Sequence, residues 1–155
     1  TYFNVVSFGS GSDNMFPQSV KYSDKEVDSA VIKVKEMSAD MGGTEIYNPL
    51  FNLITAKPID GYPKQIFLLT DGGVSNTEVD IKMVGLNNKY SRVHTIGIGN
   101  GCSEELIRGC AKKGKGCHVF ISDSEDPSEK IIQLLTDSLS PVISKMKLSY
   151  DKNLV

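Results

Sequence analysis

The sequence predicts an α/β fold in which a doubly wound, mostly parallel sheet of the Rossmann-like kind is flanked by helices. Apolar segments of strand-like character alternate with segments of helical periodicity through most of the 155 residues. The clearest strand, residues 65–70, is apolar on both faces, as expected for a central parallel strand. Glycine-rich polar loops follow or flank the strands, and in doubly wound sheets ligands bind at that edge.

The N-terminal part of the chain is expected to contain one strand and two helices. Residues 2–8 are mostly apolar and predict a strand that enters the sheet at once. The first helix is expected to begin at Ser23, because Glu26 completes a capping box, and to run as far as the glycine pair at 42–43. A shorter helix is expected over residues 48–56.

The remainder of the chain is expected to alternate strands and helices. Strands are predicted at residues 65–70, 92–98 and 117–121. Helices are predicted at residues 77–90, from Ser103 to Gly114, and from Asp126 to near Pro141. Ser103 and Asp126 are expected to cap their helices, because each precedes acidic residues that favour a helix N-terminus. Residues 146–150 predict the beginning of one further strand.

Length and composition are typical of one soluble globular domain. We assign residues 1–150 to this domain and residues 151–155 to the beginning of a following segment. The 17 basic and 19 acidic residues are interspersed, without a basic stripe, which argues against nucleic-acid binding. No apolar run approaches the roughly 20 residues that cross a bilayer. Three cysteines cannot all pair within the chain, which favours reduced thiols and a cytoplasmic over a secreted setting.

Two glycine-rich loops carry the oxygen groups that a hard cation prefers. Residues 41–46 contain Thr44, and residues 68–73 place Asp71 directly after the strand at 65–70. Glycines in both loops let the backbone turn tightly and approach a ligand closely. Hydroxyl and carboxylate oxygens are ligands for Mg²⁺. The sequence therefore predicts a candidate metal site in which Thr44 and Asp71 lie at one edge of the sheet.

These loops, taken together with the neighbouring strands, resemble the von Willebrand factor A (VWA) domain of the inter-alpha-trypsin-inhibitor heavy-chain type and its intracellular relatives. The resemblance rests on residues 3–10, 16–17, 42–46, 67–72 and 95–99, and the likeness runs in order from about residue 3 to residue 150. It implies a Rossmann-like sheet flanked by helices. It also implies a metal-ion-dependent adhesion site, where Mg²⁺ completes its coordination shell with the carboxylate of a partner protein.

The resemblance also implies which ligands are present. The family takes metal ligands from an Asp-x-Ser-x-Ser loop, a threonine and an aspartate; Thr44 matches the second and Asp71 the third. The opening strand of this sequence corresponds to the second strand of the family, so the chain is expected to be truncated at its N-terminus, with on the order of 30 residues absent. Residues 10–13 contain serine and aspartate like the Asp-x-Ser-x-Ser motif, but in a different order and at a different place in the chain. Mg²⁺ binding by this chain alone is therefore expected to be weak or absent.

Other polar residues have simpler explanations. Asp71 before two glycines is also a common turn former, and Glu45 is expected to be a solvated acid or to support the ligands indirectly. Residues 97–101 resemble half of a dinucleotide fingerprint but lack its third glycine. His94, in the middle of a strand, is expected to be structural. Zinc binding is not expected, because no paired Cys-x-x-Cys spacing includes the remaining candidates, Cys110, Cys117 and His118.

The resemblance therefore implies a protein-interaction module without enzymatic activity, which could form part of a larger multidomain protein. Its partner would present an acidic side chain to Mg²⁺ at the site of Thr44 and Asp71, which is incomplete in this chain. Two alternatives stay open. The first is a structural or assembly module that uses no metal. The second is an enzyme that processes nucleotides or phosphates in a Rossmann-like cleft, although the sequence has no Gly-x-x-x-x-Gly-Lys phosphate loop.

Overall fold

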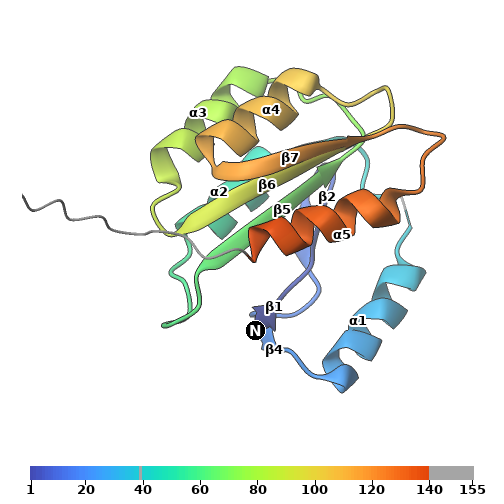
Figure 1. Ribbon diagram of the computed structural model, residues 1–155, viewed down its shortest axis with the longest axis vertical. Helices are drawn as coiled ribbons and strands as arrows, with labels where there is room; N and C mark the ends of the chain where they lie inside the picture. The colour runs from blue at the N-terminus through green and yellow to red at the C-terminus, as the bar shows by residue number, and fades with distance from the viewer. Residues whose placement is uncertain (39, 140–155) are drawn as a thin grey trace, which may run out of the picture.

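The computed structural model describes residues 1–38 and 40–139 and contains a layered α/β core (Figure 1). Three parallel strands form the middle layer, in the order β5 (Lys64–Thr70), β6 (Ser91–Ile98) and β7 (Lys115–Ile121). One face is covered by α2 (Tyr47–Thr55), α3 (Thr77–Asn87) and α4 (Glu104–Lys113). The other face is covered by α5 (Pro127–Ser138). This architecture confirms the predicted α/β fold.

The central strand of this sheet is β6, whereas the apolar pattern predicts a central place for residues 65–70. β6 pairs with β5 on one side and β7 on the other, and its residues from Val93 to Gly97 are all buried. Within the described residues β5 has a partner strand on one edge only. Ile66 and Leu68 are buried, but Leu69, which lies between Leu68 and Thr70, is 43% exposed. Leu69 is left uncovered because α5 packs mainly against β7.

The N-terminal segment forms two small antiparallel pairs and not one strand over residues 2–8. β1 (Tyr2–Phe3) pairs with β4 (Val20–Lys21), and β2 (Val6–Phe8) pairs with β3 (Ser12–Asn14). Asn4 interrupts the strand, because its side chain is bonded to the backbone around it. Its Oδ1 accepts from Val5 N at 2.9 Å and Phe16 N at 3.1 Å, and its Nδ2 donates to Phe16 O at 2.9 Å.

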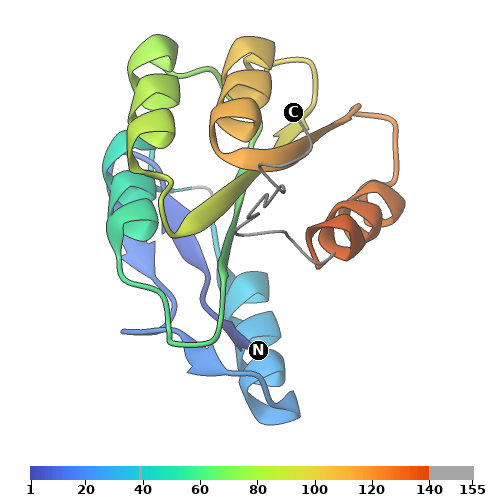
Figure 2. The same cartoon turned by 60° about the vertical axis from the view of Figure 1, so that its left-hand side comes forward.

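The first helix, α1 (Asp24–Glu36), begins where the capping pattern predicts and ends earlier than expected. The Ser23 hydroxyl accepts from Glu26 N at 3.3 Å, which confirms the N-cap. The helix stops at Glu36, not at the glycine pair 42–43. Residues 41–45 instead bond to the turn between β2 and β3, so tertiary contacts and not the glycines decide where the helix ends. Figure 2 shows α1 set apart from the other helices.

The later boundaries agree with the predicted ones within a few residues. Ser103 and Asp126 cap α4 and α5, with their side chains accepting from Leu106 N at 3.2 Å and Ser128 N at 2.9 Å. α3 ends at Asn87 and not at residue 90. The reason is that the buried side chain of Asn88 donates to the carbonyl of Lys113, the last residue of α4. The expected strand at 146–150 and Pro141 lie outside the described residues.

Two apolar clusters fill the space on either side of the sheet. The larger lies between the sheet and the helices α2, α3 and α4, and its fully buried members include Ile54, Val84 and Leu106. The smaller lies between the sheet and α5, around Ile121 and Leu134. None of the helices among the described residues is long and apolar enough to span a bilayer. The sheet is therefore packed on both faces up to the carboxyl ends of β5 and β6, and the predicted site residues lie at that edge.

Candidate functional site

Asp71 lies in the loop that begins where β5 ends. The Thr70 hydroxyl accepts from Gly72 N at 3.3 Å, which turns the chain sharply after the strand. Asp71 is exposed at this turn, while Thr70 is buried beneath it. The carboxylate is thus free to face a ligand, and the backbone that carries it is fixed by the end of the strand.

Thr44 lies directly against this turn. A β-carbon at position 72 would be 3.1 Å from Thr44 Oγ1 and 3.8 Å from its Cγ2. Gly72 therefore provides the space that lets the threonine hydroxyl approach the residue next to Asp71. The structure brings together the two residues that the sequence predicts for the site, although they are far apart in the chain and lie in different loops. Their role as metal ligands stays a prediction.

The turn between β2 and β3 holds the Thr44 loop in place. Ser10 N donates to Met41 O at 2.7 Å, and Glu45 N donates to Gly9 O at 2.9 Å. The Ser10 hydroxyl also accepts from Gly43 N at 3.1 Å. Ser10 thus supports the site through the backbone of the loop. Spacing along the sequence gives no signal for this role, because the contact joins residues 33 positions apart.

Replacing Gly9 by alanine is expected to disturb the Thr44 loop. The new β-carbon would lie 2.4 Å from Met41 Cβ and 2.6 Å from Met41 O, so the two segments must separate. We expect a loss of roughly 1–3 kcal/mol in chemical denaturation, with faster amide exchange at Gly43 and Glu45. Gly11→Ala, at a position with no atom within 4 Å, is the matched control. Equal stability of the two variants would contradict this account.

The loop that follows β6 adjoins Asp71. A β-carbon at Gly101 would be 3.1 Å from the Asp71 carbonyl oxygen. In the same loop the Cys102 thiol donates to Gly99 O at 3.3 Å, and Asn100 Nδ2 donates to Asp123 Oδ2 at 3.2 Å. The space around this loop is therefore occupied by side chains and backbone of the protein itself. The glycines at 97–101 therefore serve close packing in this structure.

The donor set at this edge fits a hard cation only in part. Thr44 contributes one hydroxyl and Asp71 one carboxylate, and Mg²⁺ prefers six oxygen ligands in near-octahedral geometry. Across residues 1–38 and 40–139, no group of three or more acidic, histidine or cysteine side chains has a geometry suited to a metal. Water and a partner's oxygens would have to supply most of the coordination shell. Tight binding by these two residues alone is not expected.

His94 is a structural residue, as the sequence predicts. It is 1% exposed, its Nδ1 accepts from Cys117 N at 3.1 Å, and its Nε2 lies 3.0 Å from Gln65 Oε1. Since Nδ1 is an acceptor, Nε2 carries the proton and donates to Gln65. Burial, with a smaller contribution from the charge of Arg92, lowers the pKa of His94. The neutral ring thus links all three strands of the sheet.

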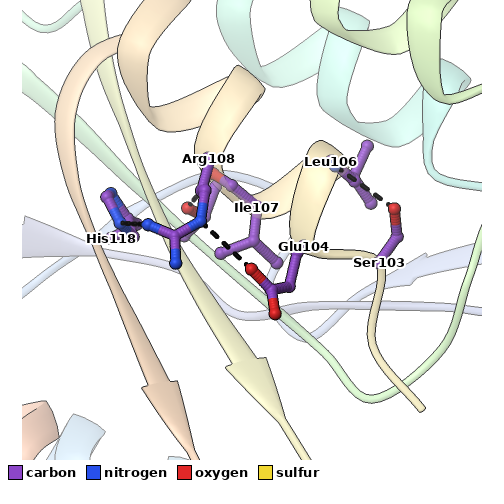
Figure 3. Close-up of polar contacts among 7 residues, drawn as sticks. Ser103, Glu104, Leu106, Ile107, Arg108 and His118 are labelled. Atoms are coloured by element: carbon purple, nitrogen blue, oxygen red, sulfur yellow. Dashed lines mark hydrogen bonds and ion pairs between the residues drawn. The ribbon is translucent and has the colours of Figure 1, made fainter. Parts of the chain in front are cut away.

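His118 belongs to an exposed polar cluster with Arg108 and Glu104, shown in Figure 3. Arg108 Nη1 lies 3.1 Å from His118 Nε2, and Arg108 Nε donates to Glu104 Oε2 at 3.3 Å. The guanidinium carbon also lies 4.9 Å from the centre of the Phe120 ring. Such exposed pairs contribute little to stability. The histidine is thus engaged in a surface contact between α4 and β7.

The comparisons with known proteins agree with this architecture. The family model described as "von Willebrand factor type A domain" matches residues 1–120. The chain is 41% identical over 149 residues to human von Willebrand factor A domain-containing protein 5A, covering 96% of this chain and 19% of that protein. A von Willebrand factor A domain-containing protein of Dictyostelium discoideum is 34% identical over 148 residues, which cover 96% of this chain and 16% of that protein. The chain therefore spans about a fifth or less of these relatives.

Solved structures share the fold. Proximal thread matrix protein 1 from the mussel byssus, with a zinc-occupied MIDAS motif, matches with a TM-score of 0.68 and 22% identity, covering 88% of this chain and 34% of that one. BatB from Bacteroides thetaiotaomicron matches with a TM-score of 0.61 and 19% identity, covering 88% and 78%. With the family match over residues 1–120, these findings show that the chain belongs to the von Willebrand factor type A domain family.

Proposed function

We propose that this chain is a protein-interaction module that recognises an acidic side chain of its partner through Mg²⁺ held by Thr44 and Asp71. The observation that carries the proposal is the approach of Thr44 Oγ1 to Gly72, which sets the hydroxyl beside the Asp71 turn. A threonine hydroxyl and one carboxylate leave the cation with a net positive charge. A carboxylate from a partner is then an attractive further ligand.

Non-enzymatic recognition agrees with the chemistry of this edge. The pair consists of one hydroxyl and one exposed carboxylate on loops, and recognition by it needs no bond to be made or broken. Gly97, near the end of β6, is closely surrounded by the chain's own side chains, unlike a glycine that lets a phosphate approach the backbone. A β-carbon at Gly97 would already lie 2.8 Å from Cys102 Sγ and 3.0 Å from Phe120 Cδ1. These contacts favour recognition over nucleotide chemistry.

A thermal unfolding series with MgCl₂ tests the metal part of the proposal. A ligand that binds only the folded state raises the unfolding midpoint by mass action. Because two ligands bind Mg²⁺ weakly, the midpoint of the wild-type chain is expected to rise only slightly and only at high Mg²⁺ concentration, and that of Asp71→Asn is expected to stay constant. Asp60→Asn, at an exposed acid in a different loop, is the control and should respond as wild type does. Equal responses of Asp71→Asn and wild type would contradict the assignment of Asp71.

A pair of synthetic peptides tests carboxylate recognition. A short glycine peptide with a single aspartate is expected to bind more tightly with Mg²⁺ than without it, and its asparagine counterpart is not. The alternative is a metal-independent assembly module, which is favoured by the β5 edge without a partner strand among the described residues. The exposed apolar residues Val31 and Val34 of α1 also favour it. A wild-type chain that does not respond to Mg²⁺ would support this alternative.

A further inference from the structure

The loop after β6 contains the pair Asn100-Gly101, and at no other place in the sequence does a glycine follow an asparagine. Both residues are exposed, so water reaches them. A glycine has no β-carbon to shield its backbone nitrogen from the side chain of the preceding residue. The chemistry that this arrangement permits has no part in the site of Thr44 and Asp71.

The two groups of this pair that can react with each other are free of hydrogen bonds. Within the part of the chain that the structure describes, no acceptor binds Gly101 N, and no donor binds the side-chain carbonyl oxygen of Asn100. Only Nδ2 of Asn100 is engaged, since it donates to Asp123 Oδ2 at 3.2 Å. The corresponding nitrogen after Asp71, Gly72 N, instead donates to a threonine hydroxyl at 3.3 Å. The loop after β6 thus leaves its glycine nitrogen available, and the loop after β5 does not.

We propose that Asn100 is a site of spontaneous deamidation, and that its conversion to an acid loosens the loop that adjoins Asp71. Gly101 N attacks the side-chain carbonyl carbon of Asn100 and forms a new C–N bond. The bond from that carbon to Nδ2 breaks, and the amide leaves as ammonia, which takes up the proton released by Gly101 N. Water then opens the cyclic imide at one of its two carbonyls, which gives aspartate or isoaspartate. The sequence of steps consumes only water.

The new carboxylate would face a second one. The Asn100 amide that now donates to Asp123 would be replaced by an oxygen that carries negative charge, and like charges at this distance repel. Asp123 has no room to withdraw toward β6, because a β-carbon at Gly99 would lie only 2.5 Å from Asp123 Oδ1. Isoaspartate adds one further carbon to the backbone at the same place. The loop after β6 is therefore expected to move away from the end of β7.

Movement of this loop would reach the turn that carries Asp71. A β-carbon at Gly101 would be 3.1 Å from the Asp71 carbonyl oxygen, so the two loops are in close contact. β6 itself is buried from Val93 to Gly97 and is expected to keep its place. The modification would thus change the carboxyl edge of the sheet without unfolding the protein. This inference does not depend on metal binding by Asp71.

Peptide mass mapping of the folded chain, stored at mildly alkaline pH, tests the modification. The peptide with Asn100 is expected to lose ammonia and gain water, and to split into aspartate and isoaspartate forms. Asn76 is the internal control, because it is also exposed but precedes the β-branched Thr77. The reaction at Asn100 is expected to be faster by roughly tenfold or more. Equal rates at the two asparagines would overturn the inference.

Amide hydrogen exchange of the variant Asn100→Asp tests the effect on the loops. Exchange at Gly101 and Gly72 is expected to be faster than in wild type. Asn76→Asp adds the same charge at another exposed position and should leave both amides unchanged. The double variant Asn100→Asp, Asp123→Asn restores one donor facing one carboxylate, so it is expected to return to the wild-type rates. Wild-type exchange in Asn100→Asp, or no recovery in the double variant, would overturn the proposed effect of the charge.

Discussion

Replacing His94 by alanine is expected to lower the free energy of unfolding by about 3–5 kcal/mol. The substitution leaves Cys117 N and the Gln65 carboxamide without their partners inside the sheet. It also opens a cavity where the imidazole stacks on Phe67, with ring centres 4.9 Å apart. Gln65 Nε2 in turn donates to Ser138 O at 3.1 Å, so the end of α5 loses support as well. Urea denaturation measures the change.

Two further variants show whether the hydrogen bonds or the ring volume matter. Asparagine at position 94 keeps an acceptor near the place of the histidine Nδ1 atom, where it can accept from Cys117 N. His94→Asn is therefore expected to be less destabilised than His94→Ala. His118→Ala removes the exposed histidine and is expected to lie within about 0.5 kcal/mol of wild type. If His94→Ala were as mild as His118→Ala, the linking role of His94 would be wrong.

The stabilising effect of His94 should depend on pH. The pKa of His94 is lowered in the folded state, while the unfolded chain has a value near the ordinary 6.5. The unfolded state therefore binds more protons below that value, and the stabilisation is complete above pH 6.5 and decreases as the pH falls. The stability difference between wild type and His94→Asn is expected to be larger at pH 7 than at pH 5. This comparison removes the contributions of the other titratable groups, which are the same in both proteins.

Replacing Gly116 by alanine is expected to cost about 3 kcal/mol or more. Gly116 lies in β7 where its pairing with β6 is irregular: Val93 pairs with Lys115, but Thr95 pairs with His118. The extra residue of β7 is accommodated by close backbone approach. A β-carbon at position 116 would lie 2.2 Å from Val93 O and 2.7 Å from Val93 C, and backbone atoms cannot move aside as a side chain can. The same unfolding measurement detects the loss.

Gly73→Ala is the matched control for this prediction. No atom lies within 4 Å of a β-carbon at Gly73, and its backbone is not left-handed, so alanine is expected to be tolerated. A His94→Asn, Gly116→Ala double variant should lose less than the sum of the single losses, because both residues support the same irregularity. Strict additivity would show that the two act separately.

Local sequence signals were sufficient for the parts of the fold that depend on neighbouring residues. Ser23, Ser103 and Asp126 cap helices because each side chain reaches backbone N–H groups two or three residues ahead. The alternation of strands and helices was equally predictable from periodicity. The end of α1 and the interruption at Asn4 were not predictable, because bonds to residues far along the chain determine both.

By itself the sequence determined the α/β class, the family resemblance and the choice of Thr44 and Asp71 as candidate metal ligands. Only the tertiary structure decided that Thr44 lies against Gly72 and that Ser10 holds its loop. It also decided that Asp80, an acid of α3, is buried. The physical reason is the same in each case: burial, electrostatic environment and close approach depend on which distant segments pack together, whereas periodicity and capping depend on residues within one helical turn.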